Sequence, residues 1–169
     1  IGLVLNGKGY DRALGTTVDE VNVAMSATDG FGLKNQGLSV DQQVQMLADI
    51  IAGRANAAGQ PGATPSLSAT LSCVWGCPFD GEVSAGQVAD LVGRIAELGV
   101  EEIALADTIG AGDPWAVTRK VEAARAAAPD AGHGHRRGGR ASHRDCGGPA
   151  APGPPPTRPT ARPLGPSLA

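Results

Sequence analysis

Along residues 1–131, short apolar runs alternate with stretches in which apolar residues recur at helical spacing. Residues 1–6 (IGLVLN) and 20–26 (EVNVAMS) are rich in valine and other aliphatic side chains, a composition typical of buried strands. Residues 67–74 and 102–106 have the same character. The pattern therefore predicts four strands.

Helix signals lie between and after these strands. Ser39 stands three residues before Gln42, and Ser84 stands three residues before Gln87, so each pair forms a capping box ahead of an apolar stripe. An Asp-Pro pair opens the last helix, where the aspartate serves as the N-cap and the proline occupies the first turn. The predicted helices span residues 10–14, 39–59, 84–98 and 113–128.

The alternation of strands and helices predicts a parallel β/α protein. Residues 28–38, which contain three glycines, are predicted to form a loop, and residues 59–66 a connector. An open doubly wound sheet and a (β/α)8 barrel both fit this rhythm. Gly7-Lys8-Gly9 lacks the Walker spacing, so the sequence offers no phosphate-binding fingerprint that would favour a nucleotide fold.

Composition changes sharply after residue 131. Residues 132–169 hold six arginines, one acidic residue, all three histidines and eight of the 13 prolines. Such a segment cannot bury enough apolar surface to offset its ordering entropy, so we expect a folded domain over 1–131 and a disordered tail over 132–169. Arg, Gly, Pro and Ala are also the residues that GC-rich DNA encodes out of frame, which makes a frameshifted or truncated gene one hypothesis for the tail.

Cysteine usage and hydropathy indicate a cytoplasmic protein without membrane contact. No run is long and apolar enough to cross a bilayer, and no signal-peptide pattern opens the chain. The three cysteines, Cys73, Cys77 and Cys146, are odd in number, which argues against a disulfide framework. The first two are spaced C-x3-C, one residue too long for the usual zinc or redox pair, and they are assigned no metal.

Two distinctive turns follow the third and fourth predicted strands. Residues 76–81 read GCPFDG, and residues 107–112 read DTIGAG. They resemble the G-C-P-[FY]-[ED]-G and D-T-I-G-x-G turns of the hydroxymethylglutaryl-CoA lyase family. The resemblance extends over nearly all of 1–131, because Lys34-Asn35 followed by Ser39 looks like the family's K-N-x-x-x-S segment.

The resemblance implies a (β/α)8 barrel in place of the doubly wound sheet. A full barrel typically needs about 250 residues, so residues 1–131 would form part of one, roughly strands 3 to 6 with their helices. The chain opens at Ile1 within an apparent strand, and we expect a segment to be missing upstream.

Asp107 is the candidate catalytic residue. It lies where a barrel strand passes into its βα loop, the face on which such enzymes place their chemistry, and the family's equivalent aspartate lies in the active site. The resemblance makes Thr108 and Ser72 candidates for substrate binding and Lys34 and Asn35 candidates for CoA contacts. A purely structural interpretation stays open, in which Asp107 satisfies the backbone of its own turn and the Lys-Asn pair belongs to a polar loop.

The resemblance also implies a reaction, the cleavage of 3-hydroxy-3-methylglutaryl-CoA to acetyl-CoA and acetoacetate in leucine degradation, with Mg2+ or Mn2+. The family takes its metal from an aspartate beside an arginine on the first strand, an H-x-H pair on the seventh and an asparagine on the eighth. Its catalytic cysteine lies in a glycine-rich loop near the eighth strand. None of these segments is recognisable here, so we expect this chain alone to bind no metal and to be inactive.

His133 and His135 form an H-x-H at about the family's distance from the DTIGAG turn. Alternate residues on a strand point the same way, so both imidazoles could bind one cation. However, glycines flank the histidines and two arginines follow, and neither residue type favours a strand. They are the weakest of the candidate site residues.

Other interpretations of function stay open. The related acyl-CoA-dependent synthases, of the isopropylmalate or homocitrate type, share the barrel and the metal chemistry, but the GCPFDG turn argues against them. A non-catalytic binding module could attach to nucleic acid through the basic tail, yet the tail has no aromatic residue and its charge is diluted by prolines. The resemblance implies an acyl-CoA as the partner, and a second copy of the chain is expected to cover unpaired sheet edges.

Overall fold

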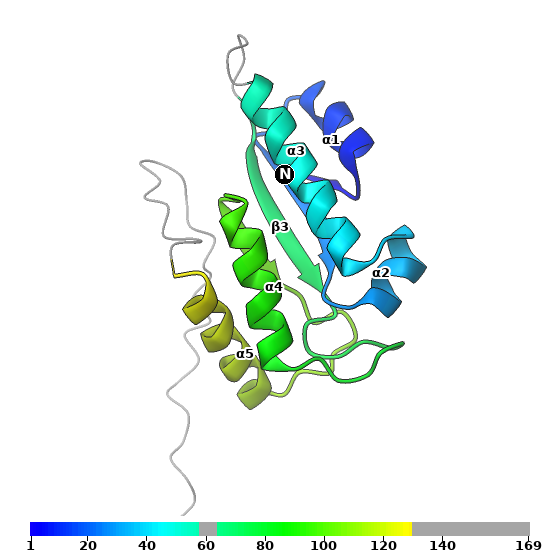
Figure 1. Cartoon of the computed structure of the whole chain (residues 1–169), viewed down its shortest axis with the longest axis vertical. Coiled ribbons are helices and arrows are strands. Elements are labelled where there is room, and N and C mark those ends of the chain that lie inside the picture. Colours follow the sequence, from blue (N-terminus) through cyan, green and yellow to red (C-terminus); the bar gives the residue numbers. More distant parts are fainter. Residues whose placement is uncertain (58–63, 130–169) are drawn as a thin grey trace, which may run out of the picture. The chain divides into compact units, whose positions relative to one another are not determined.

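A computed structural model describes residues 1–57 and 64–129 of the chain (Figure 1). Strands and helices alternate as the sequence pattern predicts, except that two helices follow the second strand. The elements are β1 (Gly2–Val4), α1 (Gly7–Leu14), β2 (Glu20–Ser26), α2 (Asp29–Gln36), α3 (Val40–Ala57), β3 (Ser66–Ser72), α4 (Ala85–Glu97), β4 (Glu102–Leu105) and α5 (Pro114–Ala127).

The four strands form one sheet in the order β1-β2-β3-β4, and every neighbouring pair is parallel. A doubly wound sheet reverses its strand order at a switch point, whereas a barrel places each new strand beside the preceding one. The consecutive order within the described residues therefore favours the barrel over the doubly wound alternative. The described residues form a segment of a (β/α)8 barrel, which confirms the predicted fold class.

Alternate strand residues form the core on the helix-covered side of the sheet. Figure 1 shows α3 and α4 running across the same side of β3. The opposite face carries polar side chains, where Asn22 Nδ2 donates to Ser68 Oγ at 2.9 Å and that hydroxyl donates to Glu20 Oε1 at 2.6 Å. The buried strand residues that face the helices are Val21, Val23, Met25, Leu67, Ala69 and Leu71.

The prediction of a loop over residues 28–38 is wrong, because most of this segment is helix α2. Its glycines mark close contacts. A Cβ on Gly30 would lie 2.5 Å from Asp80 Oδ1, and a Cβ on Gly32 would lie 2.5 Å from the Leu38 carbonyl oxygen. Gly30 and Gly32 are therefore required because Asp80 and Leu38 approach them closely, and they do not interrupt the helix.

Both predicted capping boxes are confirmed. Ser39 and Gln42 exchange bonds of 2.9 and 3.3 Å at the start of α3, and Ser84 and Gln87 exchange bonds of 2.8 and 3.2 Å at the start of α4. The N-cap of α5 is also confirmed, since Asp113 Oδ1 accepts from Ala116 N at 2.7 Å.

Three strands are shorter than predicted, and β4 ends one residue early, at Leu105. β1 covers only Gly2–Val4, and β3 ends at Ser72 because the next residue, Cys73, has a left-handed φ of 60°. The predicted tail over 132–169 and most of the predicted connector lie outside the described residues. Within the described ranges, no helix is long and apolar enough to cross a membrane.

Candidate functional site

The carboxyl ends of the parallel strands meet at one edge of the sheet, and the loop after β4 carries Asp107 there. Both carboxylate oxygens accept backbone N–H groups, Oδ1 from Ala111 at 3.0 Å and Oδ2 from Gly112 at 2.8 Å. The N–H of Gly112, with help from those of neighbouring loop residues, holds the pKa of the Asp107 carboxyl below its usual range. Asp107 is therefore an exposed, ionised group that fixes the shape of its own loop.

Gly112 completes this loop by close approach. A Cβ there would lie 2.9 Å from Trp75 Cγ and 3.1 Å from Asp107 Oδ2, which leaves no room for a side chain. The last glycine of the DTIGAG turn is thus explained by contacts with the preceding βα loop. The structural interpretation of Asp107 is compatible with a catalytic one, since each carboxylate oxygen has a second lone pair.

Thr108 links the carboxyl ends of β3 and β4. Its Oγ1 accepts from Cys73 N at 2.8 Å, and beside this bond Val74 N donates to the Ala106 carbonyl at 3.3 Å. Because the threonine oxygen acts as an acceptor here, its hydroxyl hydrogen is free to donate to another group. Ser72 is half-buried at the end of β3, where its carbonyl accepts from Ala27 N at 2.9 Å.

The GCPFDG turn closes on itself and on the loop after β2. Cys77 and Gly81 exchange backbone bonds of 2.8 and 2.9 Å. The Cys77 sulfur accepts from Thr28 Oγ1 at 3.0 Å and from the amides of Phe79 and Asp80 at 3.4 Å each. Cys77 is buried among these donors, and burial also raises the pKa of the neighbouring Cys73 thiol. Cys77 thus stabilises this turn as an acceptor, and Cys73 lies in the buried core.

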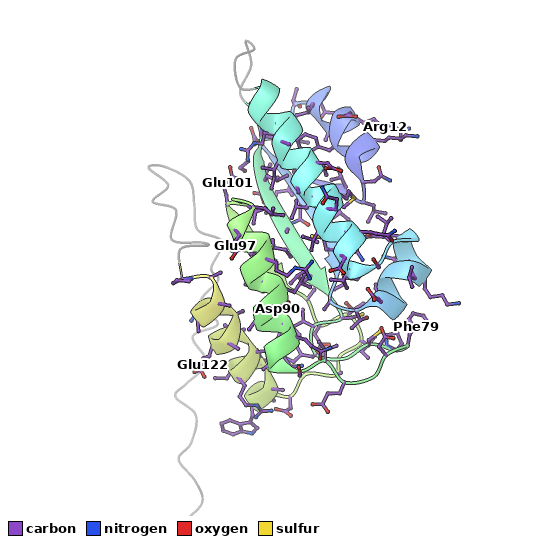
Figure 2. The ribbon with its side chains drawn as sticks, viewed as in Figure 1. Arg12, Phe79, Asp90, Glu97, Glu101 and Glu122 are labelled. Atoms are coloured by element: carbon purple, nitrogen blue, oxygen red, sulfur yellow. The ribbon has the colours of Figure 1, made fainter. Side chains whose placement is uncertain are left out.

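The same turn supplies a capping hydrogen bond at the N-terminus of α2. Asp80 Oδ2 accepts from Gly30 N at 2.7 Å, while Thr28, which precedes the helix, directs its hydroxyl to Cys77. The rings of Phe31 and Phe79 lie 6.3 Å apart, and Figure 2 shows Phe79 at the end of its loop near α2. This cap was not predicted, because its carboxylate comes from a turn 50 positions further along the chain.

Lys34 and Asn35 lie in the last turn of α2 and are exposed. Within the described residues, no hydrogen bond or ion pair joins them to Asp107 or Thr108. The structure thus brings Asp107, Thr108 and Ser72 together at the ends of β3 and β4. It places the Lys-Asn pair on a separate element, which the GCPFDG turn connects to them.

Sequence reasoning missed Lys120. It lies in α5 and is only 7% exposed, although lysine is rarely buried without a charged partner. Its Nζ donates to the Val74 carbonyl at 3.0 Å and to the Val83 carbonyl. One signal was available, because Lys120 falls on the same helical face as Val117, Val121 and Ala124.

The described residues do not fit a metal centre. No group of three or more His, Cys, Asp or Glu side chains within residues 1–57 and 64–129 is placed to hold an ion. His133 and His135 lie outside the described residues. A surface hollow of about 330 Å³ lies between α1 and α3 and is lined by residues such as Tyr10 and Met46, away from Asp107.

A family model described as HMGL-like matches residues 3–141. The chain belongs to the HMGL-like family. Mitochondrial hydroxymethylglutaryl-CoA lyase from Bos taurus is 35% identical over 121 residues, which are 72% of this chain and 35% of that protein. A Pseudomonas aeruginosa protein, named 3-hydroxy-3-isohexenylglutaryl-CoA/hydroxy-methylglutaryl-CoA lyase, is 34% identical over 142 residues, which are 82% of this chain and 45% of that protein. This chain therefore spans less than half the length of these members of the HMGL-like family.

A solved structure extends the comparison to three dimensions. An HMG-CoA lyase from Acinetobacter baumannii, in complex with coenzyme A and 3-methylmalate, matches with a TM-score of 0.66 and 29% identity. The match covers 73% of this chain and 38% of that one. The resemblance inferred from the GCPFDG and DTIGAG turns is thus confirmed at the level of family and fold.

Proposed function

We propose that this chain is the central part of a carbon-carbon lyase that cleaves 3-hydroxy-3-methylglutaryl-CoA to acetyl-CoA and acetoacetate. The observation that carries the proposal is the Asp107 loop, an ionised carboxylate at the carboxyl end of β4 within the segment that matches the family. The relative solved with coenzyme A supports an acyl-CoA as the substrate class.

In this reaction, a base takes the proton of the tertiary hydroxyl, the bond between C2 and C3 breaks, and an acid delivers a proton to the acetyl-CoA enolate that departs. Because its pKa is lowered, Asp107 accepts the hydroxyl's hydrogen bond and does not act as a proton donor at neutral pH. The free hydroxyl hydrogen of Thr108 is suited to a substrate oxygen. Ser72, half-buried one strand away, is proposed to line the same subsite.

Lys34 and Asn35 are proposed to bind the CoA portion. Both side chains are exposed on α2, which begins directly after the carboxyl end of β2. A lysine ammonium suits a phosphate group, and an asparagine amide can both donate and accept. Their separation from Asp107 fits a long substrate whose nucleotide end lies apart from its reacting end.

A divalent cation, Mg2+ or Mn2+, stays a prediction that rests on the family. Such an ion polarises substrate oxygens when it is bound. Since the described residues provide no ligand set, we propose that this chain alone binds no metal and is inactive. A cytoplasmic location and a homo-oligomeric assembly also stay predictions. The names of the relatives favour the lyase over the related synthases.

The proposal can be tested by titrating the isotope-labelled chain with 3-hydroxy-3-methylglutaryl-CoA and following the amide NMR signals. We expect shifts in the Asp107 loop and in α2, and no response to isopropylmalate. Lys34→Met should weaken binding, whereas Arg12→Met, which removes an exposed cation from the last turn of α1, should not. In Figure 2, Arg12 projects from α1 in the upper part of the view, whereas Phe79 lies lower, at the loop next to α2.

An equal response to isopropylmalate would favour the synthase interpretation, and no response to either compound would contradict the proposal. The expected inactivity is checked separately in the same samples. Formation of acetoacetate in the presence of Mg2+ would show that the chain holds a complete metal centre, against our expectation.

A further inference from the structure

The loop of residues 75–82 is held at both ends by one buried ammonium group. Lys120 Nζ donates to the carbonyl of Val74, just before the loop, and to the carbonyl of Val83, just after it. Burial lowers the pKa of Lys120, which shows that the fold places a charge where desolvation is unfavourable. The two carbonyl bonds offset part of that cost. An apolar side chain could fill the same position on α5 but could not join the two ends of the loop.

Residues 74–76, at the start of the clamped loop, contact the Asp107 loop directly. Val74 N donates to the Ala106 carbonyl, directly before Asp107. A Cβ on Gly76 would lie 3.0 Å from Ala111 Cβ, so these two loops are in close contact. Trp75 lies against Gly112, the residue whose N–H binds Asp107 Oδ2. Displacement of residues 74–76 would therefore disturb the donors that hold the Asp107 carboxylate.

The same loop reaches the second half of the candidate site. Asp80 caps α2 at Gly30, and Cys77 accepts from Thr28. Since α2 carries Lys34 and Asn35, one loop connects both groups of candidate site residues. Lys120 is the residue of α5 that anchors this loop to the helix layer.

We propose that Lys120 is a positioning residue for the candidate active site, which it organises by clamping the two ends of loop 75–82. This inference depends on the proposed function in one respect, the assignment of Asp107 as the catalytic residue. The charged groups that act on Lys120 are Glu82 on the loop, Arg119 on its own helix and Asp107 on the adjoining loop. Lys120 contacts none of the reacting atoms in this scheme and acts through the loop.

The test uses the whole chain and two readouts at the Asp107 loop. The first is the pKa of Asp107, followed by the carboxyl carbon NMR signal. The second is amide hydrogen exchange at Ala111 and Gly112. In Lys120→Met, which keeps the length but removes the donors, we expect the Asp107 pKa to rise toward its ordinary value. Exchange at the amides of Ala111 and Gly112 should accelerate by about tenfold, because the loop loses the hydrogen bonds that the Lys120 ammonium donates to it.

Arg119→Met is the matched control, since it removes one exposed positive charge from the same helical turn and should change neither readout. Lys120→Arg keeps the charge and the donors and should retain much of the low Asp107 pKa. If Lys120→Met does not fold, Lys120→Gln, which keeps side-chain N–H donors, is measured in the same way. In Lys120→Gln, the Asp107 pKa should rise by less than is expected for Lys120→Met.

The proposal is overturned if a folded Lys120 variant loses global stability while the Asp107 pKa and the two amides stay as in the unchanged chain. That result would assign Lys120 a role in packing alone. It is also overturned if Arg119→Met changes both readouts as strongly. Neither readout depends on lyase activity, so failure of this proposal is distinguishable from failure of the proposed function.

Discussion

Asp107 uses both of its carboxylate oxygens to organise the loop in which a catalytic group is expected. The amides of Ala111 and Gly112 stabilise the ionised form, which lowers the pKa and fixes the direction of the carboxylate. The structural role of Asp107 therefore does not exclude the catalytic role proposed for it. A carboxylate held by two backbone donors is already oriented for a third partner.

Asp107→Asn tests the structural part of this argument. An asparagine amide nitrogen is a donor, so it cannot accept from both Ala111 and Gly112, and one of these N–H groups loses its partner. We expect a lower midpoint of urea unfolding and faster exchange at the amide that is released. The matched control is Asp113→Asn, which makes the same change at the N-cap of α5, where asparagine caps as well as aspartate. Equal midpoints for the two variants would contradict the assigned role of Asp107.

At the scale of single elements, the sequence predicted the helix ends that are stabilised by residues close together in the chain. The capping boxes of α3 and α4 and the N-cap of α5 involve residues three apart, so the sequence pattern was sufficient. Helix α2 was missed because its cap comes from Asp80, and its glycines look like loop residues until that contact is known. The burial of Lys120 was missed for a related reason, since its partners are backbone carbonyls of a distant loop.

Gly30→Ala tests the close contact at the start of α2. The added methyl group would overlap the Asp80 carboxylate and weaken the cap, which we expect to lower the free energy of unfolding by about 2 kcal/mol. Gly53→Ala is the matched control, because Gly53 lies exposed within α3 and nothing surrounds its Cβ position. There, helix propensity predicts a gain of up to about 1 kcal/mol. Urea unfolding of both variants measures the difference, and a gain in both would mean that Asp80 does not contact Gly30.

At the scale of the whole molecule, family membership and barrel topology followed from the sequence, while the connections between layers did not. Glu101 is one such connection. Its carboxylate binds Arg54 of α3, with Nη2 and Oε1 2.8 Å apart, and accepts from Leu67 N of β3. Its own amide donates to the Leu67 carbonyl at 2.9 Å. One residue before β4 thus joins a helix and two strands that are distant in sequence.

This connection predicts a loss of stability in acid. Burial alone would raise the pKa of Glu101, but the bonds from Arg54 and Leu67 N lower it below its ordinary value. The ionised form therefore stabilises the fold above the ordinary pKa of glutamate, and this stabilisation is lost as pH falls through the lower pKa of the folded state. Because the side chain is 37% exposed, we expect only about 0.5 to 1 kcal/mol.

The measurement compares the free energy of unfolding of the unchanged chain and of Glu101→Gln between neutral and acid pH. The difference should be largest at neutral pH and should shrink toward zero below the ordinary pKa. Asp41→Asn, at the more exposed ion pair with Arg94, is the matched control and should change stability by less than about 0.5 kcal/mol at any pH. A difference for Glu101→Gln that does not vary with pH would show that the carboxylate acts through packing and not through its charge.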